Sequence, residues 1–158
     1  MKKTNSKTLI TLLVAVVISP TTSVNAQRGN GGWGQNSNYG KIFNPKTIET
    51  LTGSIVAVER IVPEAKMFYG LHLKVKTGTE TISAHLAPTC YLDNQEIQFS
   101  KGDKIMVEGS RVSFQNVPAI IATEVEKNDD VLKLRDTNGY PVWSGWRKKG
   151  MGKRRNIN

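Results

Sequence analysis

The chain has 158 residues, of which 22 are basic and 13 acidic, and it contains one cysteine. This length fits one ordinary domain and argues against a second hydrophobic core. A single cysteine excludes an internal disulfide, so the fold must be stabilised by packing or by a ligand.

The start of the chain has the three parts of a secretory signal. A basic stretch with Lys2, Lys3 and Lys7 precedes an apolar run from Leu9 to Ile18, and a polar segment ends at Ala26. The apolar run is about half the ~20 residues that a membrane-spanning helix needs. We therefore expect residues 1–26 to be cleaved, leaving a periplasmic or secreted protein without a transmembrane segment.

Residues 27–40 are rich in Gly, Asn, Gln and Ser and include a single tryptophan, Trp33. Such a composition offers too little apolar surface to offset the entropy cost of ordering. We expect a flexible leader here. Apolar density resumes at Ile42, so the folded barrel is expected over residues 41–128.

The pattern from Glu49 to Lys127 is typical of short strands separated by turn residues. The first strand is expected at 49–61, ended by Pro63. Gly53 lies inside it, and a glycine in a long first strand is what a small barrel uses to bend sharply.

Apolar and polar residues alternate in the next two segments, 71–76 and 81–86. A two-residue turn of the type that starts with glycine, at Gly78-Thr79, sets the register of this hairpin. That register pairs Val75 with Ile82, Leu73 with Ala84 and Leu71 with Leu86, all on one face. It places His72 opposite His85 on the other face, away from the core.

A short helix is expected within residues 88–98, with Leu92 and Ile97 facing inward, and strands follow at 104–113 and 117–126. This order predicts an all-β fold, a five-stranded OB-type barrel with one short helix between strands 3 and 4. The alternative is a small sandwich or an SH3-like barrel, which would lack a helix at that point.

Residues 129–146 form a tryptophan-containing extension, with a possible strand at 131–135 and a turn at 136–139. Because Trp143 and Trp146 are costly to expose, we expect this extension to pack on the barrel, although a stacking platform for a ligand is the alternative.

Residues 147–158 are expected to be a disordered tail that carries the whole positive excess, since residues 27–146 hold 13 basic and 13 acidic side chains. The tail attracts polyanions or serves only solubility. Its basic residues are Arg147, Lys148, Lys149, Lys153, Arg154 and Arg155.

Several segments resemble a family of small exported bacterial proteins with an OB-like barrel, often described as hypothetical or DNA-binding proteins. The segments are 44–50, 84–88, 102–104, 108–112, 134–136 and 143–147. The resemblance implies the barrel fold but no activity. Ala87 and Cys90 stand where that family has glycine and tryptophan, so no role of Cys90 follows from it.

The sequence contains no motif of a nucleophile, a phosphate-binding loop or a metalloprotease, so we expect a protein that is not an enzyme. Binding of an anionic polymer is the leading hypothesis, because OB barrels bind single strands through aromatic residues and a basic groove. The partner would be a nucleic acid, a glycan or anionic lipid headgroups. The candidate ligand-binding residues, besides the tail, are Phe68, Tyr69, His72, Lys74, Lys76, His85, Tyr91, Trp143 and Trp146.

Two further hypotheses remain. His72 and His85, directly opposite each other, would have Cβ atoms about 4.5–5.5 Å apart and could share a zinc or copper ion, with Cys90 as a third ligand. The same pair could instead be a cross-strand aromatic contact partly covered by the Trp143/Trp146 segment. No other cofactor is expected. The third hypothesis is a module that binds another envelope protein.

Overall fold

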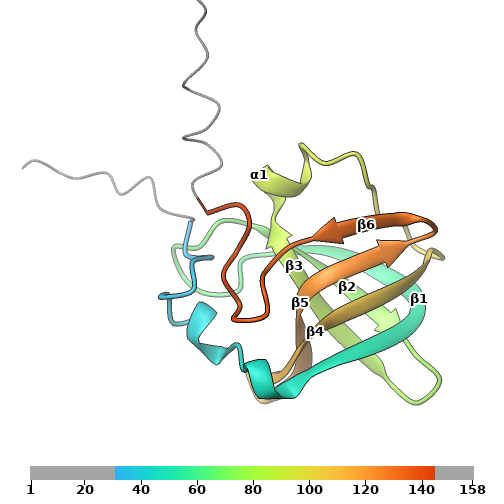
Figure 1. The fold of residues 1–158 in the computed structure, drawn as a ribbon, viewed down its shortest axis with the longest axis horizontal. Helices are drawn as coiled ribbons and strands as arrows, with labels where there is room; N and C mark the ends of the chain where they lie inside the picture. Colours follow the sequence, from blue (N-terminus) through green and yellow to red (C-terminus); the bar gives the residue numbers. More distant parts are fainter. Residues whose placement is uncertain (1–30, 145–158) are drawn as a thin grey trace, which may run out of the picture.

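The fold is a strongly bent sheet of six strands that closes on itself (Figure 1). The computed structural model describes residues 31–144. The predicted signal, the first residues of the predicted leader, Trp146 and the basic tail lie outside the described residues. The strands are β1 (Ile48–Ile61), β2 (Gly70–Lys76), β3 (Thr81–Pro88), β4 (Lys104–Phe114), β5 (Val117–Lys127) and β6 (Asp130–Lys133).

Strand β1 is long because it serves two partners. Its first half pairs with β4 and its second half with β2, and the change of partner comes at Ser54. Gly53 lies beside this point, where a Cβ would come within 2.5 Å of the carbonyl oxygen of Lys76. The predicted bend at Gly53 is confirmed, since only a residue without a side chain permits this approach.

The predicted register of the β2–β3 hairpin is confirmed between residues 72–76 and 81–85, including the pairing of His72 with His85. The predicted pairing of Leu71 with Leu86 is wrong, because the register shifts there and Gly70 pairs with Pro88. The turn type is also wrong. Gly78 does not have positive φ, and the Thr77 hydroxyl instead accepts a hydrogen bond from the Glu80 amide at 3.1 Å.

The barrel closes where β3 pairs in parallel with β5, at residues 83–85 and 119–121. The order of pairing around the barrel is β1–β2–β3–β5–β4 and back to β1. The short helix α1 (Thr89–Leu92) follows β3 directly and lies within the predicted range. These two features establish the OB-type barrel and exclude the sandwich and SH3-like alternatives.

The core contains the residues that the alternation pattern predicts. Leu73, Val75, Ile82, Ala84 and Leu86 are at most 2% exposed. Helix α1 contributes Leu92, as predicted, while Ile97 packs against the core only partly buried. In the predicted C-terminal extension, β6 pairs with β5, and the loop that follows buries Trp143.

The part of the predicted leader that the structure describes, residues 31–40, packs against the barrel. Within residues 31–40, Trp33 and Tyr39 are 2% and 1% exposed and belong to the hydrophobic core cluster. Two short 3-10 helices, Gly40–Ile42 and Pro45–Thr47, then lead into β1. The composition of this segment is polar, but its two large aromatic rings supply enough apolar surface to hold it against the barrel.

Gly109 provides a test of how tightly β4 and β5 approach each other. A Cβ on Gly109 would lie 2.4 Å from the Ile121 carbonyl oxygen, whereas one on Gly78 would meet nothing within 4 Å. We expect Gly109→Ala to lower the free energy of unfolding by about 1–3 kcal/mol. Gly78→Ala is the matched control and should shift it by less than about 0.5 kcal/mol. Urea unfolding measures both, and equal effects would contradict the close approach.

Candidate ligand-binding face

OB barrels bind oligonucleotides and oligosaccharides on the outer face of strands 2 and 3, between the loop that joins strands 1 and 2 and the loop that joins strands 4 and 5. Here the corresponding connections are the β1–β2 loop, residues 62–69, and the β4–β5 turn, residues 115–116. The two connections meet, since the Gln115 side chain donates a hydrogen bond to the Pro63 carbonyl at 3.4 Å. The face between them is therefore the first place to look for a ligand site.

His72 and His85 occupy this face and form a stacked pair. Their ring centroids are 3.8 Å apart and their planes differ by 13°. Both side chains are 2% exposed. They lie on the outer face, as the predicted register implies, but the exposure expected of ligand-binding residues is wrong, because other parts of the chain cover them. The predicted cross-strand aromatic contact describes their geometry.

The cover comes from the N-terminal segment, residues 31–43. The Tyr39 ring stacks on His85 at a centroid distance of 6.0 Å, and its hydroxyl is hydrogen-bonded to Nδ1 of His85 at 2.8 Å. Trp33 packs edge-on against His72 and donates a hydrogen bond from Nε1 to the Phe68 carbonyl at 2.9 Å. Two aromatic rings of the chain itself thus occupy the face where other OB barrels stack a ligand.

The glycine at the start of β2 makes room for this cover. A Cβ on Gly70 would lie 2.0 Å from the Trp33 ring, so any side chain there would displace the tryptophan. On the opposite side, the Phe114 ring packs edge-on against both Tyr39 and His85. The covering rings are therefore held between the first residue of β2 and the last residue of β4.

Burial keeps both histidines neutral at neutral pH. It lowers the pKa of His72 to about 4, with smaller contributions from the charges of Lys74 and Arg135. The pKa of His85 is lowered further, first by burial and then by the neighbouring His72. Burial also raises the pKa of Tyr39 well above its usual value, so its hydroxyl remains protonated.

The stacked geometry gives no support to a shared metal ion. The lone pairs of an imidazole lie in the ring plane, so two parallel rings do not direct them at one point. Within residues 31–144, no group of three or more His, Cys, Asp or Glu side chains is placed to hold a metal. Cys90 is partly exposed in α1. The zinc or copper site stays a prediction.

A buried arginine connects this face to the C-terminal loop, residues 134–144. Arg135 is 7% exposed, and its Nη1 donates hydrogen bonds to the carbonyls of Leu86 and Ala122 at 2.7 and 2.6 Å. Its guanidinium lies 4.8 Å from the centroid of the Trp143 ring. Burial lowers the pKa of Arg135 to about 10, which leaves it charged at neutral pH.

The predicted ligand-binding residues do not form one surface. His72, His85 and Trp143 are buried, whereas Phe68 and Tyr69 are 46% and 60% exposed at the end of the β1–β2 loop. Of the remaining residues, Lys76 is exposed, Lys74 lies 4.0 Å from the Glu59 carboxylate, and Tyr91 packs half-buried against Trp143. Trp146 lies outside the described residues. The structure thus divides the predicted set into a buried cluster and an exposed loop.

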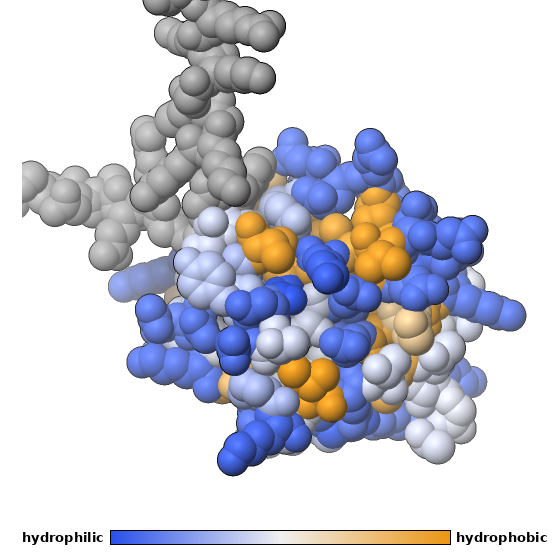
Figure 2. Space-filling view, in the orientation of Figure 1, coloured by the Kyte–Doolittle hydropathy of each residue, from blue (hydrophilic) through white to orange (hydrophobic). Residues whose placement is uncertain are grey.

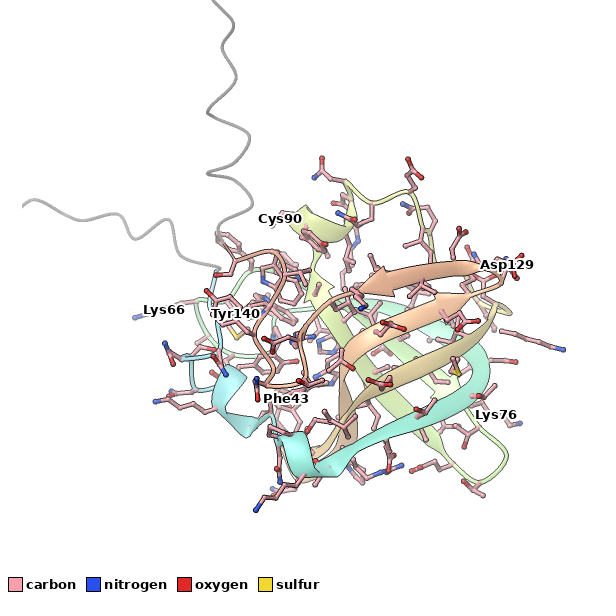
Figure 3. All side chains as sticks on the ribbon, viewed as in Figure 1. Phe43, Lys66, Lys76, Cys90, Asp129 and Tyr140 are labelled. Carbon is pink, nitrogen blue, oxygen red and sulfur yellow. The ribbon has the colours of Figure 1, made fainter. Side chains whose placement is uncertain are left out.

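Sequence reasoning missed three buried members of this cluster, Trp33, Tyr39 and Arg135, and the half-buried Phe114. The one available signal was the presence of two large aromatic residues in an otherwise polar leader. Figure 3 shows how the N-terminal segment and the C-terminal loop approach each other beside the barrel, and the Gln35 side chain donates a hydrogen bond to the Asn138 carbonyl at 2.9 Å.

Comparison with known protein families shows the family to which the chain belongs. The model of the MamS/MamX magnetosome protein family matches residues 47–132, which span β1 to β6. The chain belongs to the MamS/MamX family. The expected kinship with a family of small bacterial proteins agrees with this membership, whereas export and DNA binding stay predictions.

Other comparisons add little. No curated protein matches the chain. Among solved structures, a chain of the S. pombe Stn1–Ten1 complex is 21% identical and has a TM-score of 0.40, with 67% of this chain and 77% of that chain covered. A likeness at this level says nothing about what the chain binds. Within the described residues, no helix is long and apolar enough to cross a membrane.

The aromatic cover should contribute strongly to stability. We expect Trp33→Ala to lower the free energy of unfolding by about 3–5 kcal/mol, as for other buried tryptophans. Tyr39→Phe keeps the ring but leaves Nδ1 of His85 without its partner, which costs about 1–3 kcal/mol. Thermal unfolding measures both changes. If both variants unfolded like the unmodified protein, residues 31–40 would be the flexible leader that composition predicts.

The histidine pair should make stability depend on pH. Both folded-state pKa values lie below the unfolded value of about 6.5. The contribution of the two histidines to the free energy of unfolding is therefore fully present above that pH and is lost as the pH drops towards 4. Between pH 7.5 and pH 5, each histidine should lower the free energy of unfolding by on the order of 2 kcal/mol.

His72→Phe retains a flat ring and removes one titrating group. It also removes Nε2 of His72, which is buried without a partner. We therefore expect the variant to lose about half of this pH dependence. Urea unfolding at a series of pH values measures the difference, and identical slopes for both proteins would show that His72 is not held neutral.

Proposed function

We propose that this member of the MamS/MamX family is an exported, non-enzymatic OB barrel that binds an anionic polymer or surface through its basic tail, in a magnetosome-related role. The observation that carries the proposal is the filled ligand-binding face. Because Trp33 and Tyr39 occupy that face, an anionic ligand must be bound elsewhere.

The distribution of charge supports the tail as the binding element. Residues 31–144 contain 12 basic and 13 acidic side chains, so the folded part has no positive excess. Several of its basic groups also have acidic partners. Arg111, for example, binds the carboxylates of both Glu49 and Glu80. The six basic residues of the tail have no acid among them and therefore carry the attraction for a polyanion.

The barrel then serves to hold the tail at a fixed place. Its stability comes from a core that includes its own N-terminal segment, and the C-terminal loop is fixed by the Arg135 hydrogen bonds before the tail begins. The predicted signal would deliver this unit to the cell envelope. This arrangement suits an accessory protein that attaches a folded domain to an acidic partner.

The tail should determine how strongly the protein binds a polyanion. We expect residues 27–158 to bind heparin and to elute at a much higher salt concentration than a variant with all six tail residues changed to Gln. Counterion release makes the loss steep, since each neutralised contact lowers the slope of log K against log salt by about 0.7–0.9.

A matched control removes the same charge from the barrel. It changes six exposed lysines to Gln: Lys41, Lys46, Lys76, Lys101, Lys104 and Lys133. Elution of this control should change far less than that of the tail variant. Equal losses in both variants would show that only net charge matters, and weak retention of the unmodified protein would contradict polyanion binding.

A further inference from the structure

One end of the barrel combines exposed apolar side chains with the point where the tail leaves. We call this end the loop pole and define it by Phe68 and Tyr69 of the β1–β2 loop and by Tyr140 and Val142 of the C-terminal loop. Their exposed fractions are 46%, 60%, 51% and 45%. In the view of Figure 1, both described ends of the chain reach this side of the molecule.

Contacts through α1 connect the two loops into one surface. The Thr89 amide, at the start of α1, donates a hydrogen bond to the Tyr69 carbonyl at 2.9 Å. Two residues on, the Tyr91 ring packs against Trp143 with centroids 5.5 Å apart. Val142 precedes this tryptophan in the chain, so the exposed residues of the two loops are joined by a short run of contacts.

The tail begins beside these residues. The Tyr140 hydroxyl is hydrogen-bonded to that of Ser144 at 3.1 Å, and Ser144 is the last described residue. Arg147 follows three residues later, which limits its distance from Ser144 to about 10 Å. The first basic residues of the tail therefore cannot be far from the exposed rings.

The positive charge beside the loop pole comes from the tail, not from the described residues. Figure 3 shows Lys66 and Tyr140 towards one end and both Lys76 and Asp129 towards the opposite end. The β1–β2 loop carries Glu64 and Lys66 and the C-terminal loop carries Arg135 and Asp136, so neither loop has a positive excess. An anionic surface would therefore attract this end of the molecule through the tail.

We propose that the loop pole docks on an anionic lipid bilayer, with Tyr69, Tyr140 and Val142 in the headgroup region and the tail bound to the lipid phosphates. This inference rests on the proposed function and names its acidic partner. Tyrosine is enriched at membrane interfaces, and stable attachment needs an apolar and a basic contribution together.

A bilayer fits this surface better than a nucleic acid does. Valine cannot stack on a base, and the face that would bind a single strand is filled by Trp33 and Tyr39. Apolar areas also occur elsewhere, but Figure 2 shows them separated by hydrophilic residues on the face in view. Val131 of β6 is 54% exposed and lies outside the two loops of the loop pole, so it serves as a control position.

The test uses residues 27–158, which contain the whole described fold, and vesicles of phosphatidylcholine with or without about 30 mol% phosphatidylglycerol. We expect sedimentation with the anionic vesicles only. The triple variant Tyr69→Ser, Tyr140→Ser, Val142→Ser should bind them about tenfold or more weakly, with unchanged elution from heparin. The control variant Met106→Ser, Val131→Ser should bind vesicles and heparin like the unmodified protein.

Fluorescence quenching tests the insertion of the loop pole into the bilayer without relying on a measured affinity. In Tyr69→Trp the added indole should be quenched by brominated anionic lipids, whereas in Val131→Trp it should not.

Each outcome decides one of the two proposals. Heparin binding without vesicle binding, or equal vesicle binding by the triple variant, would overturn lipid docking and leave polyanion binding intact. An equal loss towards heparin and vesicles in the triple variant would show a general polyanion surface, nucleic acid included, and would also overturn lipid docking. Absence of binding to both would overturn the proposed function itself.

Discussion

Closure of the barrel depends on β1 turning from one partner to the other within a single strand. This change of partner is possible because Gly53 has no side chain. A Cβ at this position would lie 2.5 Å from the carbonyl oxygen of Lys76. Once β1 has turned, β2 and β3 continue around one side and β4 and β5 around the other, until β3 and β5 meet in parallel at residues 83–85 and 119–121. This last pairing sets the position of the histidine pair, because His85 is one of its residues.

The alternation of residue types predicted this frame well. In β2 and β3 every second residue is apolar, and a shift of one residue would turn the whole set towards solvent, so only one register buries them. The predicted pairing of Val75 with Ile82 and of His72 with His85 is confirmed for that reason. The local turn geometry was predicted wrongly, because the Thr77 hydroxyl accepts the hydrogen bond from the Glu80 amide that the Thr77 carbonyl would accept in a glycine turn.

What covers the outer face could not be predicted in the same way. Alternation indicates which residues face away from the core but not whether another segment packs on them. Trp33 lies 39 positions before His72 in a segment whose composition predicts disorder, and Arg135 lies 50 positions after His85. Contacts at such separations depend on the closed barrel, so no local pattern shows them. The sequence therefore predicts the pairing of the two histidines but not their burial.

The cover also changes how the fold relates to function. In an OB barrel with an open face, aromatic residues on strands 2 and 3 are free to stack on a ligand. Here that stacking is made within the chain, and the Tyr39–His85 hydrogen bond adds a polar contact that a displacing ligand would have to replace. Releasing both rings would expose a tryptophan and a tyrosine together, which is costly. The filled face therefore stabilises the barrel, and the binding that we propose uses the exposed loop pole and the basic residues that follow it in the chain.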